Sequence, residues 1–499
     1  MTPLLFAGMP LLAVVILNIP SWGRYRAVAI WAVSLIAPLQ FALAVYAAAR
    51  CLSTGAPIPA AFGIDFSVDL LSAVILAVIA LVAGVASVVA HSTVKRKQFS
   101  FGNALLLLIA GMNCQVMVSD AFSLYVFIEA VSIASFLLIA INQKIDELEG
   151  AFKYYLMSAL ATMMLTLSIA MLFGLTGGTS FATLSAYARA NAGAHPIALS
   201  ASIIMFAAAL LVKSGAIPFH TWVPDAHSSA PAPVSVVLAG VVIKVSGAYS
   251  LMRVFRDVFP VDPGIGRVLA AFGLVSVVGG ALAAMGQSDI KRMLAFSSVS
   301  QIGYIVLGVS TGSPLGFFGA AAHFFNHATF KSLLFADSAV IAERTGTRDM
   351  NKMGGLAAAM PVTGVSSILG LMSMAGIPPL SGFWSKLLIV IALWRVSPGL
   401  ALAALFSSAL TLAYFLILQK KVFFGKAPAL AGGGPDAGEP EYGTKPSAGG
   451  HECAGGLIAG GPECNAGLKF VQILLSAINV AVGLLFPALL TYLNGKGIL

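Results

Sequence analysis

The stretch LLVKSGAIPFHTWVPDAH, residues 210–227, places a lysine and a Gly-Ala-Ile-Pro break at the end of a long apolar run. A charged side chain costs on the order of 3 kcal/mol at the centre of a membrane helix, so a lysine at that depth needs a functional reason. Proline removes a backbone donor, and the carbonyls that it frees are tolerated at membrane depth only beside protein or water. The stretch therefore predicts a broken membrane helix that carries a buried cation, Lys213.

Composition places the whole chain in a membrane. Of its 499 residues, 59% are hydrophobic and only 9% are charged, whereas soluble domains carry about a quarter charged residues. Apolar segments of about 18 residues or more recur from end to end; a membrane barrel would show alternating segments of about ten residues instead. We therefore expect an all-α polytopic membrane protein with about fourteen transmembrane helices.

The basic residues predict the orientation in the membrane. The net charge is +9, and the lysines and arginines, Lys291 and Arg292 among them, fall mainly in odd-numbered loops. The positive-inside rule places those loops in the cytoplasm and both termini outside. Arg253 and Arg256 fit this rule least well. The charge thus favours control of topology over a nucleic-acid partner, and we expect a multi-pass protein of the cell inner (plasma) membrane, in contact with lipid.

Motifs for cofactors and metals are missing from the sequence. It holds no P-loop, no GxGxxG fingerprint and no CxxC pair among its four cysteines. His451, Cys453 and Cys464 lie in a Gly/Pro-rich segment, 425–464, with spacing unlike known metal sites, so this segment is interpreted as a flexible cytoplasmic loop. We expect no cofactor and no metal in this chain, and any redox energy must come from a partner.

A second break resembles the first one. GIPPLSGFW at 376–384 parallels GAIPFHTW at 215–222, and each has a lysine nearby, Lys386 and Lys213. Paired broken helices at corresponding positions of two halves are the best sequence pointer to a transport site. Helices 7 and 12 of the expected fourteen are therefore predicted to be broken.

Five ionisable residues fall well inside predicted spans: Glu129, Lys213, Lys244, Lys331 and Lys386. One buried lysine can be structural, but five such groups favour ion conduction. Lysine suits this task because desolvation disfavours its charged form and a neighbouring carboxylate restores it. At about 4 Å, an effective dielectric of about 20 gives roughly 4 kcal/mol, so a Lys–Glu pair of variable distance can load and release a proton. Lys213 is predicted to be a proton carrier.

The stretch HFFNHATFK adds two histidines to this set. His323, His327 and Lys331 are spaced at i, i+4 and i+8, which puts all three on one helix face. Histidines titrate near neutrality and serve as proton relays. We therefore expect His323 and His327 to take part in proton transfer together with Lys331.

Four further polar residues have alternative interpretations. His220 and His227 lie in the connection PFHTWVPDAH, where each either serves a water-filled exit or caps the turn. Asp225, between them, suits the N-cap of the segment that follows. Asp337 lies further along the same span than Lys331. It is a ligand for a second cation, a local partner of a lysine, or a residue at the membrane edge.

These motifs resemble the antiporter-like subunits of respiratory complex I, membrane-bound hydrogenases and Mrp-type Na+/H+ antiporters. The likeness covers roughly residues 100–425 and rests on DAFSLYVFIEA, KSGAIPFHTWVPDAHSSAPAPVSVVLAGVVIKVSGAYSLMR, HFFNHATFKSLLF and GIPPLSGFWSKLL. It implies two inverted five-helix repeats, each a half-channel with a broken helix. It also implies a hydrated polar axis through Glu129, Lys213, Lys244, His323, His327, Lys331 and Lys386.

The resemblance also implies roles and a division of the chain. Glu129 perturbs Lys213, Lys244 connects the two halves, and Lys386 faces the other side. Asp337 departs from the family, which usually has small or apolar residues there. The parts are an N-terminal three-helix segment (1–100), two repeats (101–256 and 257–424), the Gly/Pro-rich loop (425–468) and a C-terminal transmembrane helix (469–499).

The function implied is that of a proton-translocating membrane subunit in a complex I-like assembly of NADH:quinone oxidoreductase or hydrogenase type. Its partners are other membrane subunits, and it holds no redox centre of its own. The alternative is a mid-sized subunit of a multisubunit Mrp-type Na+/H+ antiporter. A carrier of small organic solutes is disfavoured because the buried polar set is almost all titratable. The sequence leaves open whether H+ or Na+ is transported.

Overall fold

Long apolar helices make up nearly all of the computed structural model, which describes residues 2–19, 27–61, 63–190, 196–425 and 464–495. Within these ranges, 11 helices are long and apolar enough to cross a membrane, and Pro3–Leu17 and Pro361–Ala375 are shorter apolar helices. The expected all-α membrane fold is confirmed. The count of about fourteen spans stays a prediction, because length and composition alone select 11.

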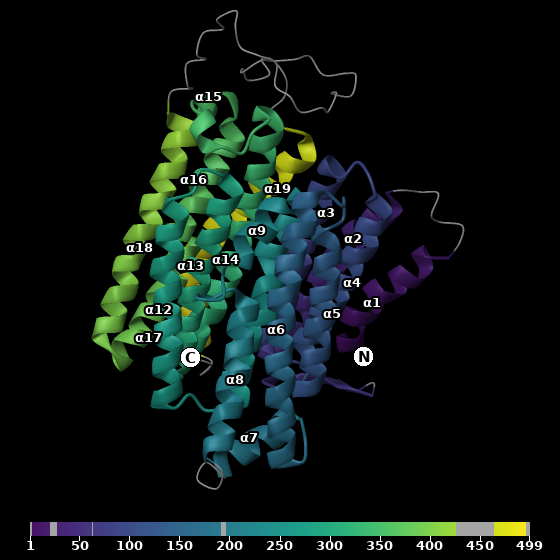
Figure 1. The fold of residues 1–499 in the computed structure, drawn as a ribbon, viewed down its shortest axis with the longest axis vertical. Helices are drawn as coiled ribbons and strands as arrows, with labels where there is room; N and C mark the ends of the chain where they lie inside the picture. Colours follow the sequence, from purple (N-terminus) through teal and green to yellow (C-terminus); the bar gives the residue numbers. More distant parts are fainter. Residues whose placement is uncertain (1, 20–26, 62, 191–195, 426–463, 496–499) are drawn as a thin grey trace, which may run out of the picture.

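The helices run side by side in one bundle (Figure 1). The first four are α1 (Thr2–Leu17), α2 (Val28–Thr54), α3 (Leu70–Thr93) and α4 (Gln98–Met117). The next are α5 (Ala121–Ile139), α6 (Ile145–Thr176), α7 (Phe181–Ala190), α8 (Pro196–Ser214), α9 (Trp222–Ser229), α10 (Ala232–Val237), η2 (Leu238–Val242), η3 (Lys244–Tyr249) and α11 (Ser250–Asp257). The remainder are α12 (Pro263–Met285), α13 (Ile290–Ser310), α14 (Pro314–Thr345), η4 (Met350–Lys352), α15 (Leu356–Ala359), α16 (Pro361–Ala375), α17 (Ser381–Val396), α18 (Pro398–Leu418), η5 (Gln419–Phe424) and α19 (Ala466–Gly495).

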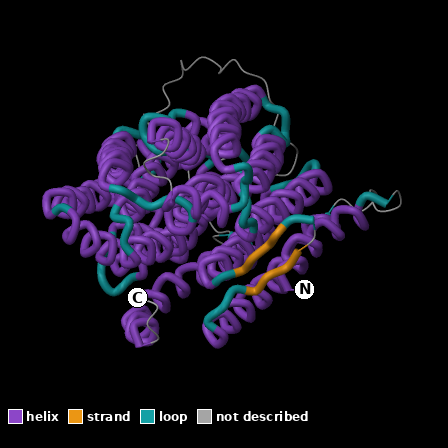
Figure 2. The backbone as a smooth tube through the Cα atoms, turned by 90° about the horizontal axis from the view of Figure 1, so that it is seen from below, coloured by secondary structure: helices purple, strands orange, loops and turns teal. Residues whose placement is uncertain are grey.

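A short hairpin joins α2 to α3 and is an exception to the all-α expectation. Strands β1 (Ile58–Ala61) and β2 (Asp65–Val68) pair antiparallel, with Ile58 opposite Val68. Figure 2 shows the two strands side by side at one end of the bundle. Gly63 turns the chain between them with φ of +68°, a backbone conformation that glycine adopts without steric cost.

Both predicted helix breaks are present. The first lies between the end of α8 at Ser214 and the start of α9 at Trp222, and Gly215 within it has φ of +68°. The second lies between Ala375 of α16 and Ser381 of α17. Backbone donors at both breaks find side-chain acceptors, because Ile217 N donates to Ser276 Oγ at 3.0 Å and Gly382 N donates to Ser373 Oγ at 3.2 Å.

A π-helical stretch lies in the middle of the most buried span. The helix from Ala232 to Asp257 is buried along its whole apolar window, and η2 and η3 widen its central turns. Gly247 of η3 lies against the end of α8, since a Cβ there would be 2.3 Å from Ser214 N. This close approach brings the span that carries Lys244 directly onto the helix that carries Lys213.

Helix α14 occupies the centre of the bundle (Figure 1). It packs against α3, α10, α13, α16, α17 and α19, and most residues between His323 and Ile341 are buried. The predicted histidine and lysine stripe is therefore enclosed by protein on all sides and does not face lipid.

Candidate functional site

Three helices converge on the ammonium group of Lys213 in the last turn of α8. Lys213 is 6% exposed, and its Nζ donates to Ser132 Oγ of α5 at 2.7 Å and to Ser158 Oγ of α6 at 2.5 Å. Hydrogen bonds to a charged donor contribute more than neutral ones, about 1.5–3 kcal/mol each. The two hydroxyls therefore offset part of the cost of burying the charge.

Glu129 lies one helical turn before Ser132 on α5, and its charge acts on Lys213. Among the described residues, no ion pair within 4 Å joins the two groups. Glu129 Oε2 is buried and has no hydrogen-bond partner in the described part of the chain. The structure thus shows the Glu–Lys pair in an open arrangement, with the lysine held by hydroxyls.

A small cavity connects Lys213 with the π-helical span. Its volume is about 10 Å³, close to the minimum for one water molecule. It is lined by Tyr154, Ser158, Val212, Lys213, Trp222, Val242, Ile243 and Ser246. Ser246 Oγ and Trp222 Nε1 are buried without a hydrogen-bond partner among the described residues, so one water here would have several polar neighbours.

Lys244 lies at the start of η3, directly after Ile243, which lines this cavity. It is 1% exposed, and its Nζ donates to the carbonyl oxygens of Ala239 and Gly240, the latter at 2.8 Å. Both carbonyls belong to its own π-helical stretch. Single π turns inside α-helices occur often at functional sites, and here the widened turn holds the central lysine.

The predicted stripe on α14 is fully buried and faces helices α13 and α17. His323 Nδ1 lies 3.0 Å from Ser385 Oγ, and its ring stacks on that of His327 with 6.1 Å between centroids. Lys331 Nζ donates to Leu294 O at 2.8 Å and to Ser297 Oγ at 2.5 Å, both on α13. Both ring nitrogens of His327 lack a hydrogen-bond partner within the described ranges.

Lys386 lies on α17, directly after the serine that contacts His323. It is 5% exposed, and its Nζ sits over the ring of Tyr304 at 4.5 Å from the centroid. A cation–π contact of this kind stabilises a desolvated ammonium by about 2 kcal/mol. The charges of Lys386 and Lys244 both act on His323, so the central lysine and the lysine of α17 are electrostatically connected through α14.

The two histidines of the connection after the first break have different surroundings. His220 is half-buried, with its ring 6.0 Å from that of Phe296. His227 is 0% exposed and stacks on Phe335 at 4.9 Å, and the charges of Lys291, Lys331 and Lys244 act on it. His227 therefore lies inside the bundle, next to the polar set, and not at a surface turn.

Asp225 is not the helix N-cap that the sequence suggested. It lies inside α9 and accepts hydrogen bonds from Lys153 Nζ at 2.8 Å and Arg292 Nη1 at 2.7 Å. Burial raises the pKa of Asp225, but the two cations outweigh burial and hold the pKa below its ordinary value. The carboxylate thus ties α6, α9 and α13 together by ionic contacts.

Lys291 was predicted from the sequence to lie in a loop, but it is a buried cation. It is 6% exposed, and its Nζ donates to Ala230 O at 2.7 Å and to Ser235 Oγ at 3.4 Å. Ser235 in turn donates to His227 O at 3.1 Å. The available signal was Asp289, which caps α13 through Arg292 N at 3.0 Å and so places Lys291 in the first helical turn.

Asn479 of α19 is a second buried polar residue that was not predicted from the sequence to take part in the site. Its Oδ1 accepts hydrogen bonds from Thr329 at 3.3 Å, Ser373 at 3.2 Å and Ser381 at 3.2 Å. Ser373 and Ser381 flank the second helix break. The C-terminal helix therefore holds the broken helix in place from one side.

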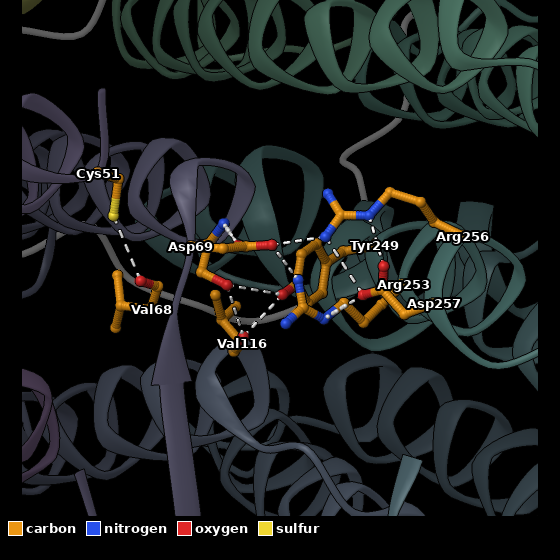
Figure 3. Close-up of polar contacts among 9 residues, drawn as sticks. Cys51, Val68, Asp69, Val116, Tyr249, Arg253, Arg256 and Asp257 are labelled. Atoms are coloured by element: carbon orange, nitrogen blue, oxygen red, sulfur yellow. Dashed lines mark hydrogen bonds and ion pairs between the residues drawn. The ribbon is translucent and has the colours of Figure 1, made fainter. Parts of the chain in front are cut away.

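Arg253 and Arg256 form an ionic cluster where the π-helical span ends (Figure 3). Asp69 Oδ2 accepts from Arg253 at 2.6 Å and from Arg256 at 2.5 Å, and Asp257 pairs with both arginines. Tyr249 OH donates to Val116 O at 2.7 Å beside them. Two carboxylates balance two guanidinium groups, which explains why these arginines did not fit the positive-inside pattern.

The same cluster anchors the start of α3. Asp69 Oδ1 accepts from Ser72 N at 2.8 Å and so caps this helix. Burial raises the pKa of Asp69, but Arg253 and Arg256 act in the opposite direction and hold the pKa well below its ordinary value. Asp69 is therefore ionised at any physiological pH.

The described chain shows no group of three or more His, Cys, Asp or Glu side chains that could hold a metal ion. His451 and Cys453 lie outside the described residues, and Cys464 is half-buried.

Comparisons with known proteins show the family of this chain. Residues 118–411 match the family described as NADH:quinone oxidoreductase/Mrp antiporter, TM. The chain is 32% identical over 379 residues to NADH-quinone oxidoreductase subunit N of Desulforudis audaxviator, covering 74% of this chain and 75% of that protein. It is 31% identical over 337 residues to a Na(+)/H(+) antiporter subunit of Alkalihalophilus pseudofirmus, covering 67% of this chain and 68% of that protein.

A solved structure shares the fold along nearly the whole chain. A chain of the Mrp complex from Dietzia sp. DQ12-45-1b superposes with a TM-score of 0.85 at 26% identity, covering 99% of this chain and 96% of that one. The resemblance noted in the sequence motifs is therefore confirmed. The chain belongs to the NADH:quinone oxidoreductase/Mrp antiporter family of membrane subunits.

Proposed function

We propose that this chain moves protons across the membrane as one subunit of a multisubunit complex, through Glu129, Lys213, Lys244, His323, His327, Lys331 and Lys386. The observation that carries the proposal is the burial of these groups in two electrostatically linked sets, Glu129 with Lys213 and Lys244 with the polar residues of α14 and α17, which meet where α8 packs against η3. Glu129 acts on Lys213, and Lys331 acts on Lys244. The charges of Lys244, Lys331 and Lys386 all act on His327.

The open Glu129–Lys213 arrangement supports a loading step. With the carboxylate apart, the Lys213 ammonium relies on two hydroxyls, and the one-water cavity extends from it to the π-helical span that carries Lys244. When the pair closes, the carboxylate stabilises the charged lysine by roughly 4 kcal/mol at about 4 Å. Opening and closing of this pair would therefore take up a proton and pass it on.

The driving assembly has two candidates, each with its own support. Redox drive in an NADH-quinone oxidoreductase type of complex is supported by the identity to subunit N over three quarters of each chain. Secondary antiport is supported by the superposition with the Mrp complex along nearly all of the chain. Addition of an electron donor to membrane vesicles distinguishes the two candidates. The pH of the vesicle lumen should change only if the complex is redox-driven.

The proposal includes the orientation of the chain in the membrane and its division into two repeats. We place both termini outside the cytoplasm of a cell inner (plasma) membrane, with two half-channel repeats at 101–256 and 257–424. Figure 1 shows both ends of the chain in the half of the bundle away from α15, which supports a location of both termini on the same side. Cysteine-labelling of either terminus from the outer side of intact cells tests it.

The central test uses Lys213 in the complete complex reconstituted into vesicles. Lys213→Ala should lower the rate of proton movement at least about tenfold, because a methyl group cannot carry a proton. Lys213→Arg is the matched control for charge: it keeps a cation but releases no proton at physiological pH, so it should fail in the same way. Proton movement at the parent rate in Lys213→Ala would refute the carrier role.

A further inference from the structure

A second polar cluster lies inside the bundle, apart from the lysine and histidine set. It joins Asp337 of α14, Thr363 and Ser366 of α16, and Gln472 of α19. Ser366 Oγ donates to Asp337 Oδ1 at 2.8 Å, and Gln472 Nε2 donates to Asp337 Oδ1 at 2.9 Å and to Thr363 Oγ1 at 3.0 Å. All four residues are at most 3% exposed.

The depth of the cluster in the membrane follows from its place in each helix. Asp337 precedes the end of α14 at Thr345 by about 12 Å of helix. Gln472 follows the start of α19 at Ala466 by about 9 Å of helix. The carboxylate is therefore inside the protein but only two helical turns from one end of the bundle.

A groove leads to this cluster from the outside of α16 and α19. Its volume is about 750 Å³, and Ser366, Gln472 and Ser476 are among the residues that line it. Ser476 is 8% exposed, and its Oγ has no hydrogen-bond partner among the described residues. The groove thus has mainly apolar walls, and Ser366, Gln472 and Ser476 are its polar lining residues.

The helices that build the cluster bring few other charges to it. The sequence of α16, Pro361–Ala375, contains no ionisable residue, and the only ionisable residues of α19 are Lys469 near its start and Tyr492 near its other end. On α14, Lys331 is turned toward α13 by its bonds to Leu294 and Ser297. Glu343 and Arg344 lie in the last turn of that helix. Asp337 is thus the one carboxylate that these three helices place at this depth.

We propose that Asp337, Thr363, Ser366 and Gln472 form a site that binds one Na+ ion in exchange for one proton. The inference rests on the proposed function and gives it a second ion. Hard cations prefer oxygen ligands from carboxylates, hydroxyls and amides, which is the set present here. The carboxylate of Asp337 offsets the charge of one monovalent ion, which lowers the cost of placing that ion in the protein interior.

The two occupied forms use the same residues. In the proton form, the hydroxyl of protonated Asp337 joins the hydrogen bonds from Ser366 and Gln472. In the sodium form, Gln472 turns its amide by 180° and presents Oε1, so that the carboxylate, Thr363 Oγ1 and Gln472 Oε1 all face the ion. Before this turn, Gln472 Oε1 accepts a long hydrogen bond from Cys464 Sγ at 3.8 Å, and breaking so weak a bond costs little. Entry of Na+ therefore releases H+, and charge is conserved.

The test is protection of Asp337 from dicyclohexylcarbodiimide, an apolar reagent that modifies protonated carboxyl groups in membranes. The complete complex in native membrane vesicles is treated at pH 6.5 with NaCl or with choline chloride at equal ionic strength. Mass spectrometry then quantifies modification at Asp337 and at Glu129. At a Na+ concentration ten times the dissociation constant, bound ion should slow modification of Asp337 about tenfold, while modification of Glu129 stays constant.

Two variants sharpen the experiment. Thr363→Val keeps the shape of the side chain but removes one ligand, so Asp337 should still be modified while protection by Na+ weakens at least about fivefold. Ser408→Ala, which changes a hydroxyl on α18 beside Tyr304, is the matched control and should keep full protection.

Specific outcomes would overturn the site. These are equal modification with and without Na+, equal protection by choline, and no modification of Asp337 in Na+-free buffer. Failure of the proton-carrier proposal would instead show as proton movement that persists in Lys213→Ala, so the two failures are distinguishable.

Discussion

Removal of the Asp69 carboxylate should loosen the end of the bundle where α3 begins and α11 ends. Asp69→Ala deletes the N-cap of α3, which contributes about 1 kcal/mol. It also deletes the bonds to Arg253 and Arg256. These pairs are partly solvated, with the Asp69 side chain 23% exposed, and Asp257 still holds both arginines. We therefore assign about 1 kcal/mol to them together, toward the surface end of the range.

The buried thiol of Cys51 provides a local readout of this change. Cys51 is 7% exposed, and its Sγ donates to Val68 O at 3.4 Å, next to Asp69 (Figure 3). Local opening that detaches Val68 and Asp69 exposes the thiol, and its alkylation rate then follows the free energy of opening. A loss of about 2 kcal/mol corresponds to an increase of about 30-fold in the rate of maleimide labelling.

Mass spectrometry of the labelled complex in vesicles measures this rate for each cysteine separately. Asp65→Ala is the matched control, because Asp65 is exposed on β2 and forms no ion pair among the described residues. The pKa of Asp69 lies below its ordinary value, so its contribution to stability is complete above about pH 4 and is lost only as pH falls further. The ratio of variant to parent rates should stay constant from pH 8 to pH 5. A ratio near 1, or one that collapses between pH 7 and pH 5, would contradict this reasoning.

Two further substitutions test how the broken helices are held. Gly247→Ala would place a Cβ 2.3 Å from Ser214 N, and because backbone atoms cannot yield, we expect proton movement to fall at least about tenfold and stability by about 1–3 kcal/mol. Gly174→Ala is the control, because nothing lies within 4 Å of the added Cβ, and it should change neither proton movement in the same vesicle assay nor stability. Asn479→Leu removes the acceptor of three buried hydroxyls and should cost about 1–3 kcal/mol or more. Asn479→Asp keeps an acceptor and should recover part of the loss; equal unfolding temperatures of Asn479→Leu and the parent complex would show that the contact is dispensable.

The membrane class and both helix breaks were predictable because they depend on local chemistry. The apolar runs set the class, and Gly-Ala-Ile-Pro and Gly-Ile-Pro-Pro cannot continue a helix whatever packs around them. The buried lysines were predictable for a related reason, since the cost of a charge at membrane depth makes each one conspicuous in an apolar segment.

The remaining features depend on partners far away in the sequence. In the sequence, Asn479 is one polar residue in an apolar helix. Its function as a hydrogen-bond acceptor depends on the packing of α19 beside Ser373 and Ser381. Lys291 looks like a loop cation because it lies near a surface turn, and its burial depends on Ala230 and Ser235 of another span. The π-helical stretch at Leu238–Tyr249 has no recognisable sequence signal, since it depends on the fit of Gly247 against Ser214.

The helix that carries Lys244 is anchored at one end and wound loosely in the middle. Beyond Tyr249, Arg253 and Arg256 both pair with Asp69 at the start of α3, so the last two turns cannot rotate without breaking these two ionic contacts. Any helix rotation that changes the direction of the Lys244 side chain must therefore occur between Leu238 and Tyr249. In this segment η2 and η3 are π-helical and have more residues per turn than an α-helix. One end of the span is held in place, so rotation about the helix axis is restricted to the π-helical segment that carries Lys244.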